Sequence, residues 1–275
     1  MDGYMLNNGV LMPALGLGTF TMSRFTLVKV VIKACKFGYT SFDTSAAYGN
    51  EKALGYGIKL CGKKRTDIFI TTKLSNTQQR SGNIDKSIKD SLRLLNVKYI
   101  DLYLMHWPNT DTYLSSWIEM EKLYKQGFVR AIGVCNFHQH HFEKLFKIAN
   151  ITPVINQIEI HPLLSQKKLI EFCKSNTIQV EAYSPLARMY EKLIKNELLI
   201  RLAIKYSKTV EQIILRWDYQ NDIITIPKTQ NYSRLKSNID IFNFTLDDKE
   251  IKSIDNINED FRVRNDPDNC DFSKL

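Results

Sequence analysis

Four side chains that can carry or hold a proton stand near the ends of short strand-like segments in this sequence. Asp43, Lys73 and His106 each follow such a segment directly, and Tyr48 lies a few residues beyond Asp43. The three segments end about one strand-plus-helix unit apart. Because the parallel strands of a closed barrel all end on the same rim, we expect these groups to meet there as a set of proton-transfer groups.

Each of these residues, taken alone, has an ordinary structural interpretation. Asp43 would be a cap, Tyr48 a loop aromatic, Lys73 a surface lysine and His106 a core histidine, and most such residues are structural. Their joint placement on one rim favours a catalytic site instead. A phenol titrates near pH ~10, so we expect Lys73 to lower the pKa of Tyr48 and Asp43 to keep Lys73 charged. His106 is expected to hydrogen-bond a substrate oxygen.

The segments that should position these groups alternate between strand and helix. Tyr4–Leu6 and Val10–Met12 flank an Asn-Gly turn, which predicts an N-terminal β-hairpin. Eight strands are expected after it, at Ala14–Gly18, Thr40–Asp43, Ile68–Thr72, Tyr99–Met105, Ala131–Val134, Val154–Glu159, Gln179–Tyr183 and Ile223–Pro227. Helical periodicity occurs between and after them, at Leu27–Phe37, Asn83–Leu94, Trp117–Tyr124, Phe142–Ile148, Gln166–Lys174, Leu198–Tyr206, Val210–Tyr219 and Tyr232–Ile239.

Eight repeats of strand and helix in ~250 residues favour a (β/α)8 TIM barrel over an open doubly wound sheet. The interval from Tyr183 to Ile223 contains two helical segments, and Asp247–Asn256 predicts a further helix near the end of the chain. Extra helices are therefore expected after strands seven and eight. The polar tail from Asp260 should fold over one rim as a loop. No linker divides the sequence, so we expect residues 1–275 to form one barrel domain.

Composition restricts the environment and the partners. The chain has 275 residues, of which 44% are hydrophobic and 24% charged, as in soluble globular proteins. No apolar run approaches the ~18 residues of a membrane helix, and no signal-peptide pattern opens the sequence. Five scattered cysteines suit a reducing, cytoplasmic location. The net charge of +9 is spread over many segments, so we expect a solvated basic surface rather than a nucleic-acid groove.

Seven motifs occur in an order that resembles the aldo-keto reductases. They are Gly38-Tyr39-x-x-Phe42-Asp43-Thr44-x-x-x-Tyr48-x-Asn50-Glu51, Thr72-Lys73, Leu104-Met105-His106-Trp107-Pro108, Ile132-Gly133-Val134-Cys135-Asn136-Phe137, Asn156-Gln157-x-Glu159-x-His161-Pro162, Ala182-Tyr183-Ser184-Pro185-Leu186 and Ile226-Pro227-Lys228-Thr229. The likeness runs from about Leu6 to the tail. It looks most like a small microbial and protozoan branch that includes methylglyoxal reductases, diketogluconate reductases and prostaglandin F synthases.

This resemblance implies a barrel that uses NADPH to reduce aldehydes and ketones, including small aldehydes and dicarbonyls. It implies that Tyr48 donates the proton, that His106 orients the carbonyl oxygen, and that Lys73 and Asp43 tune the phenol. A monomer acting on a small molecule is expected, without nucleic-acid or membrane partners. An NADPH-binding sensor or regulatory subunit with slow turnover is the alternative, which the intact set of four residues disfavours.

Cofactor binding must differ from that of Rossmann dehydrogenases, because the sequence has neither a Gly-x-Gly-x-x-Gly fingerprint nor a Gly-Lys-Ser/Thr phosphate loop. Lys228, Asn231 and Arg234 surround the start of the helix after strand eight, which suits a phosphate dianion. The resemblance places the adenosine 2′-phosphate and adenine there, and predicts a preference for NADPH over NADH. The full set of cofactor contacts that it implies is Thr19, Asp43, Cys135, Asn136, Gln157, Tyr183, Ser184, Leu186, Lys228, Thr229, Asn231, Arg234 and Asn238.

The sequence departs from the family pattern at four positions. Cys135 stands where a serine commonly bonds the carboxamide, and a thiol bonds more weakly. Ser237 stands where a glutamate often contacts adenine. Phe20 and Ser75 replace tryptophans often seen at the pocket mouth, so Ser75 is expected to leave the pocket wider or wetter. The predicted substrate pocket consists of Phe20, Tyr48, His106 and Trp107.

A metal site is not expected. His138, His140 and His141 open a predicted helix, but the sequence places no cysteine or acidic ligand pattern near them. His161 is expected to be a structural corner rather than a catalytic residue.

Overall fold

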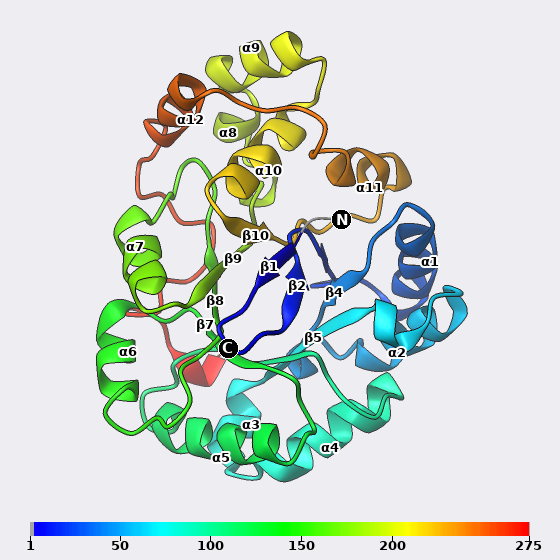
Figure 1. The fold of residues 1–275 in the computed structure, drawn as a ribbon, viewed down its shortest axis with the longest axis vertical. Coiled ribbons are helices and arrows are strands. Elements are labelled where there is room, and N and C mark those ends of the chain that lie inside the picture. The colour runs from blue at the N-terminus through cyan, green and yellow to red at the C-terminus, as the bar shows by residue number, and fades with distance from the viewer. Residues whose placement is uncertain (1–2, 275) are drawn as a thin grey trace.

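The computed structural model describes residues 3–274 and contains a rolled parallel sheet surrounded by helices (Figure 1). The eight strands follow one another around the sheet in chain order. They are β3 (Leu17–Gly18), β4 (Ser41–Asp43), β5 (Phe69–Leu74), β6 (Leu102–Met105), β7 (Ile132–Cys135), β8 (Ile155–Glu159), β9 (Gln179–Tyr183) and β10 (Ile223–Thr225). A parallel bridge between Leu15 and Thr225 joins the first strand region to the last. The (β/α)8 prediction is confirmed.

The N-terminal hairpin is also confirmed and lies across one end of the barrel. Its strands β1 (Gly3–Met5) and β2 (Leu11–Pro13) pair antiparallel, and Figure 1 shows them in front of the barrel centre. Leu6 and Met12 are buried in an interior cluster with strand residues such as Leu102. The hairpin therefore fills the end of the barrel at which the strands begin.

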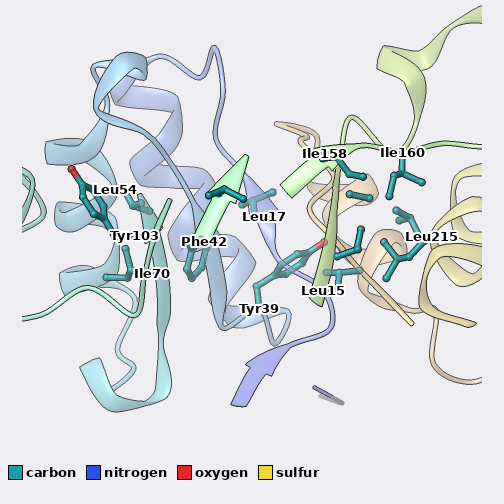
Figure 2. Close-up of a cluster of buried hydrophobic side chains, with 14 of the residues drawn as sticks. Leu15, Leu17, Tyr39, Phe42, Leu54, Ile70, Tyr103, Ile158, Ile160 and Leu215 are labelled. Carbon is teal, nitrogen blue, oxygen red and sulfur yellow. The ribbon is translucent and has the colours of Figure 1, made fainter. Parts of the chain in front are cut away.

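Strand periodicity decides which side chains face the barrel interior. In β6, Leu102 and Leu104 belong to the interior cluster, whereas Tyr103 and Met105 pack outward against the helices. Figure 2 shows part of this outer layer, with Tyr103 beside Ile70 and Leu54. Because successive side chains point to opposite faces, the outward packing of Ile70 and Leu74 in β5 turns Lys73 into the barrel.

The helices form the outer layer (Figure 1). They are α1 (Arg24–Lys36), α2 (Glu51–Leu60), α3 (Asn76–Ser81), α4 (Ile84–Leu95), α5 (Tyr113–Lys125), α6 (Gln139–Leu145), α7 (Lys167–Ser175), α8 (Glu191–Ile194), α9 (Glu197–Tyr206), α10 (Val210–Gln220), α11 (Tyr232–Ile239) and α12 (Asp248–Asp255). The expected extra helices after the seventh and eighth strands are present as α8, α9 and α12. Among residues 3–274, no helix is long and apolar enough to span a membrane.

The sequence did not predict α2, because Gly55 and Gly57 lower helix propensity. Packing explains them. A Cβ at Gly55 would lie 2.2 Å from the carbonyl oxygen of Leu95, and one at Gly57 would lie 2.9 Å from Cβ of Val31. The two glycines thus allow α2 to approach α4 and α1 closely, and the burial gained there outweighs the propensity cost.

The tail after α12 crosses the rim where the strands end, as expected. The backbone N–H groups of Val263 and Arg264 donate to the buried carboxylate of Glu159, at 2.7 and 3.1 Å. Farther along, Arg80 donates to the carbonyl oxygen of Phe272 at 2.8 Å. In Figure 1 the orange-to-red tail runs down the side of the barrel that carries α7 and α6.

Candidate active site

The structure brings all four predicted rim residues together. Lys73 Nζ donates to both carboxylate oxygens of Asp43, at 2.6 and 2.7 Å, and to the carbonyl oxygen of Thr44 at 2.9 Å. The same ammonium lies 3.5 Å from the hydroxyl of Tyr48. Lys73 is fully buried and Asp43 almost so, and a buried ion pair with these further hydrogen bonds is held in one geometry.

Local structure places Tyr48 against His106. Tyr48 ends a short 3₁₀ helix, Ala46–Tyr48, which Ser45 caps by accepting the N–H of Ala47. The rings of Tyr48 and His106 meet edge to face with centroids 5.8 Å apart. Ser45 Oγ lies 3.3 Å from Nδ1 of His106. With the Ser45 hydroxyl donating to Nδ1, the imidazole N–H is on Nε2.

Lys73 lowers the pKa of Tyr48 as expected, but the net shift is upward. Removal from water raises the pKa of Tyr48 to about 12, and the opposing effect of Lys73 is smaller. Burial disfavours the Lys73 ammonium, but its interactions with Asp43, Tyr48 and Cys135 together outweigh burial and raise the pKa of Lys73. Burial, assisted by Lys73 and Arg264, lowers the pKa of His106 to about 3. At neutral pH the site therefore holds a protonated phenol, an ammonium and a neutral imidazole.

A buried hydrogen-bonded layer lies behind the Asp43–Lys73 pair. Gln157 Nε2 donates to Asp43 Oδ2 at 2.9 Å and to Glu181 Oε2 at 2.7 Å. Glu181 is completely buried. Burial, with repulsion from Asp43, raises its pKa to about 8. The layer fixes the carboxylate of Asp43, and sequence reasoning did not identify Glu181 as part of it.

A cavity of about 810 Å³ opens in front of these residues and extends to the start of α11. The four predicted substrate-pocket residues line it at one end. Among the predicted cofactor contacts, the lining residues are Asp43, Asn136, Gln157, Tyr183, Ser184, Leu186, Lys228, Thr229, Asn231, Arg234 and Asn238. Thr19 and Cys135 are buried behind the wall. There, Thr19 Oγ1 donates to the carbonyl oxygen of Asp43 and Cys135 Sγ lies 3.8 Å from Gln157 Oε1.

The far end of the cavity has the features of an anion site. Asn231 caps α11 by accepting the N–H of Arg234 at 3.1 Å. Lys228 and Arg234 are exposed side chains on the cavity wall, and within residues 3–274 neither forms an ion pair. At the other end, the amide side chains of Asn136 and Gln157 line the cavity. A long, polar molecule with a phosphate at one end and a carboxamide at the other fits this donor set.

Further hydrogen bonds link residues at the catalytic end of the cavity. Tyr183 donates its hydroxyl to Asn136 Oδ1 at 2.7 Å, and Asn136 Nδ2 donates to the carbonyl oxygen of His106 at 3.0 Å. The side-chain amide of Asn136 is therefore held in place by the backbone of His106. Asn136 has φ +62°, in the left-handed region that asparagine adopts more readily than most residues other than glycine.

The positions that depart from the family pattern have clear local roles. Ser75 is buried and caps α3, where its hydroxyl accepts the N–H of Gln78 at 3.2 Å. Ser237 Oγ donates to the carbonyl oxygen of Arg234 at 3.2 Å. Phe20 packs against Tyr48 with ring centroids 5.0 Å apart. Ser75 does not line the cavity, so its effect on pocket width stays a prediction.

Sequence reasoning missed several residues of the cavity wall. Arg188 and Met189 follow β9, while Arg264 and Lys274 come from the tail. The tail residues lie more than 150 positions from the rim residues they approach, and no periodicity marks them. Only the folded tail brings them to the site.

The histidines at the start of α6 contact an acidic residue that the sequence did not place there. Asp268 of the tail lies 2.7 Å from Nδ1 of His138 and 3.4 Å from Nε2 of His140. Arg262 donates to Nε2 of His138, and Nδ1 of His141 accepts the N–H of His138. With these nitrogens accepting, the ring N–H groups of neutral His138 and His141 face Asp268 of the tail. We therefore interpret the cluster as a hydrogen-bonded latch that holds the tail against α6. His161 is buried against Glu159, at 3.0 Å.

Comparisons of sequence and of structure agree on the family of this chain. The model of the Aldo/keto reductase family matches residues 14–259. The chain is 46% identical to a glyoxal reductase of Bacillus subtilis over 272 residues, 98% of each chain. It is 40% identical to the methylglyoxal reductase DkgA of Escherichia coli over 265 residues, 96% of each. A Bombyx mori aldo-keto reductase solved in complex with NADP superposes with a TM-score of 0.92, at 34% identity, covering 97% of this chain and 96% of that one.

The fold and the cavity define an α/β-barrel oxidoreductase. This chain belongs to the aldo/keto reductase family. It is an NADP-dependent enzyme of carbonyl reduction.

Proposed function

We propose that this protein reduces small aldehydes and dicarbonyls, with NADPH as the reductant and Tyr48 as the proton donor. The observation that carries the proposal is the hydrogen-bonded arrangement of Asp43, Lys73 and Tyr48 beside His106 at one end of the cavity. The named relatives support the substrate class, since one is a glyoxal reductase and another a methylglyoxal reductase.

The family resemblance and the donor set of the cavity support the following cofactor contacts. Lys228, Arg234 and the N-terminus of α11 would hold the 2′-phosphate, with Asn238 at the adenine. Asn136 and Gln157 would hold the carboxamide, Tyr183 would support the nicotinamide ring, and Ser184 and Leu186 would lie along the pyrophosphate. When bound, the cofactor supplies the hydride that reaches the carbonyl carbon.

The rim residues then supply the proton and the orientation. The Nε2–H of His106 donates a hydrogen bond to the carbonyl oxygen and polarises the carbonyl group. The neutral imidazole keeps its proton during this step. The hydroxyl of Tyr48 transfers its proton to the same oxygen as negative charge develops there. Lys73 stabilises the resulting phenolate, and Asp43 keeps the ammonium in place. Proton transfer from solvent restores the phenol.

We also propose that the protein works in the reducing cytosol as a monomer. All five cysteines are free thiols in the structure, and a reducing compartment preserves that state. Size-exclusion chromatography with light scattering of the purified protein would test the monomer directly, since a dimer would double the mass.

Steady-state assays test the proposed function. The purified protein should oxidise NADPH in the presence of methylglyoxal, glyoxal or an aromatic aldehyde, with one NADPH consumed per alcohol formed. Tight NADPH binding without turnover of any carbonyl compound would contradict the proposal and favour a sensor or regulatory role.

Arg234→Ala should weaken NADPH binding roughly 10- to 100-fold, the effect of losing one charge-assisted phosphate contact, while NADH binding changes little. The reason is that only NADPH carries the 2′-phosphate at this position. Fluorescence titration of both cofactors measures the two affinities. The matched control is Arg201→Ala, on the exposed face of α9 away from the cavity. Equal losses for NADPH and NADH would place the phosphate elsewhere.

A further inference from the structure

One cationic side chain at the catalytic end of the cavity has no role in the reaction described above. Arg264, on the tail, is half-buried and lines the cavity wall. Its guanidinium lies over the face of Phe20, 5.0 Å from the ring centroid, and the ring of Phe20 lies 5.0 Å from that of Tyr48. Arg264 therefore borders the space in which the carbonyl compound must lie.

The backbone of Arg264 is held firmly. Its N–H and that of Val263 donate to the buried carboxylate of Glu159. The latch between Asp268 and the histidines of α6 holds the tail on the other side. Packing on an aromatic face limits the orientation of the guanidinium. The charge is thus presented from a fixed position rather than from a freely moving loop.

The charge of Arg264 is also uncompensated. Within the described residues 3–274, its guanidinium forms neither an ion pair nor a side-chain hydrogen bond. Arg262, two residues earlier, bonds His138 at 3.2 Å and Gln166 at 3.4 Å. The two arginines therefore differ: the guanidinium of Arg262 bonds residues that hold the tail, whereas Arg264 lines the cavity with a guanidinium that no described side chain bonds.

Lys274 of the tail also lines the cavity, but it forms an exposed ion pair with Asp271 at 3.1 Å. Its charge is already partly matched. The field of Arg264, in contrast, reaches the catalytic histidine, because it contributes to the lowered pKa of His106.

We propose that Arg264 forms an anion subsite and that the preferred substrates are short aldehydes bearing a carboxylate a few carbon atoms from the carbonyl group. A guanidinium offers two parallel N–H donors that match a carboxylate. Phe20 covers the apolar carbon chain between the two ends of such a substrate. The inference rests on the proposed carbonyl-reductase function and specifies the substrate class of the same site.

The test compares aldehydes that differ only in charge. Succinic semialdehyde and butanal have the same chain length, and the wild-type protein should show a kcat/KM at least about 10-fold higher for the anionic aldehyde. In Arg264→Met this ratio should fall about 10- to 100-fold, chiefly through KM, because the contact is made in the ground state and the transition state alike. Salt should reduce the preference of the wild-type protein. A ratio unchanged by the substitution would overturn the proposal.

Two controls distinguish the subsite from a structural effect. Arg262→Met removes a neighbouring arginine that does not line the cavity. Because the bonds to Glu159 and the contact between Asp268 and His138 still hold the tail, the ratio between the two aldehydes should change far less than in Arg264→Met. An Arg264→Met protein that loses NADPH affinity as strongly as it loses the substrate ratio would assign the arginine to the cofactor and overturn the subsite. Glyceraldehyde 3-phosphate compared with glyceraldehyde distinguishes phosphate from carboxylate recognition, and a larger charge effect there would overturn the carboxylate assignment.

The proposed function and the subsite fail in different ways. If the wild-type protein reduces neither charged nor neutral aldehydes, the carbonyl-reductase proposal fails. If it reduces both without a preference for the anionic one, only the subsite fails.

Discussion

Tyr48→Phe is expected to lower kcat for carbonyl reduction by roughly 10²- to 10⁴-fold, the usual contribution of a positioned general acid, while NADPH affinity stays nearly unchanged. The substitution removes one oxygen atom, which is the atom 3.5 Å from Lys73 Nζ. The four bonds among Asp43, Lys73, Thr44 and Gln157 do not involve it. The site should therefore keep its shape and lose only the proton that reaches the carbonyl oxygen.

Steady-state kinetics with methylglyoxal and a fluorescence titration of NADPH measure the two quantities. Tyr56→Phe is the matched control, because Tyr56 lies on α2 and 58% of it is exposed to solvent. A Tyr48→Phe protein that reduces aldehydes at a near-normal rate would reject the proton-donor role. Loss of NADPH binding would show that the phenol acts in binding instead.

Lys73→Met should abolish most activity and also destabilise the fold by roughly 3–5 kcal/mol, the usual cost of leaving a buried charge without its partner. Lys73 supplies the only ammonium within hydrogen-bond distance of Asp43 in the described chain, and both side chains are buried. Methionine fills the space of the lysine stem but leaves the carboxylate with the Gln157 amide alone. The melting temperature should fall by roughly 10 °C.

The double variant Asp43→Asn/Lys73→Met separates stability from catalysis. Removing both charges leaves no unpaired ion, so the melting temperature should recover most of the loss, whereas activity should stay low because the phenol lacks the ammonium. Thermal unfolding followed by circular dichroism, together with the aldehyde assay, gives both readings. A single variant as stable as the wild type would contradict the buried ion pair as a structural element.

The raised pKa of Tyr48 changes how the four rim residues work together. The sequence favoured a phenol made more acidic by Lys73, but removal from water has the larger effect and raises the pKa to about 12. At neutral pH the phenol is therefore fully protonated before a carbonyl compound arrives. In the proposed mechanism, the ammonium then serves mainly to stabilise the phenolate that forms as the proton is transferred.

The sequence by itself determined the order of strands and the residues that end them. Strand and helix periodicities are local. Lys73 lies near the carboxyl end of its strand and His106 directly after its own, so alternation and connection rules place them on one rim. The sequence did not predict α2, because Gly55 and Gly57 lower its helix propensity. These glycines are explained only by the close packing of α2 against other helices.

Only the tertiary structure decided how deeply the rim residues are buried and which distant residues contact them. The degree of desolvation of Tyr48 depends on everything around it, and no local pattern measures that. Glu181 joins Asp43 through Gln157, across the interior of the barrel. Arg264 reaches Phe20 because Glu159 and the α6 histidines hold a polar tail over the rim. Contacts of this kind join residues far apart in the chain, and they become fixed only when the barrel closes.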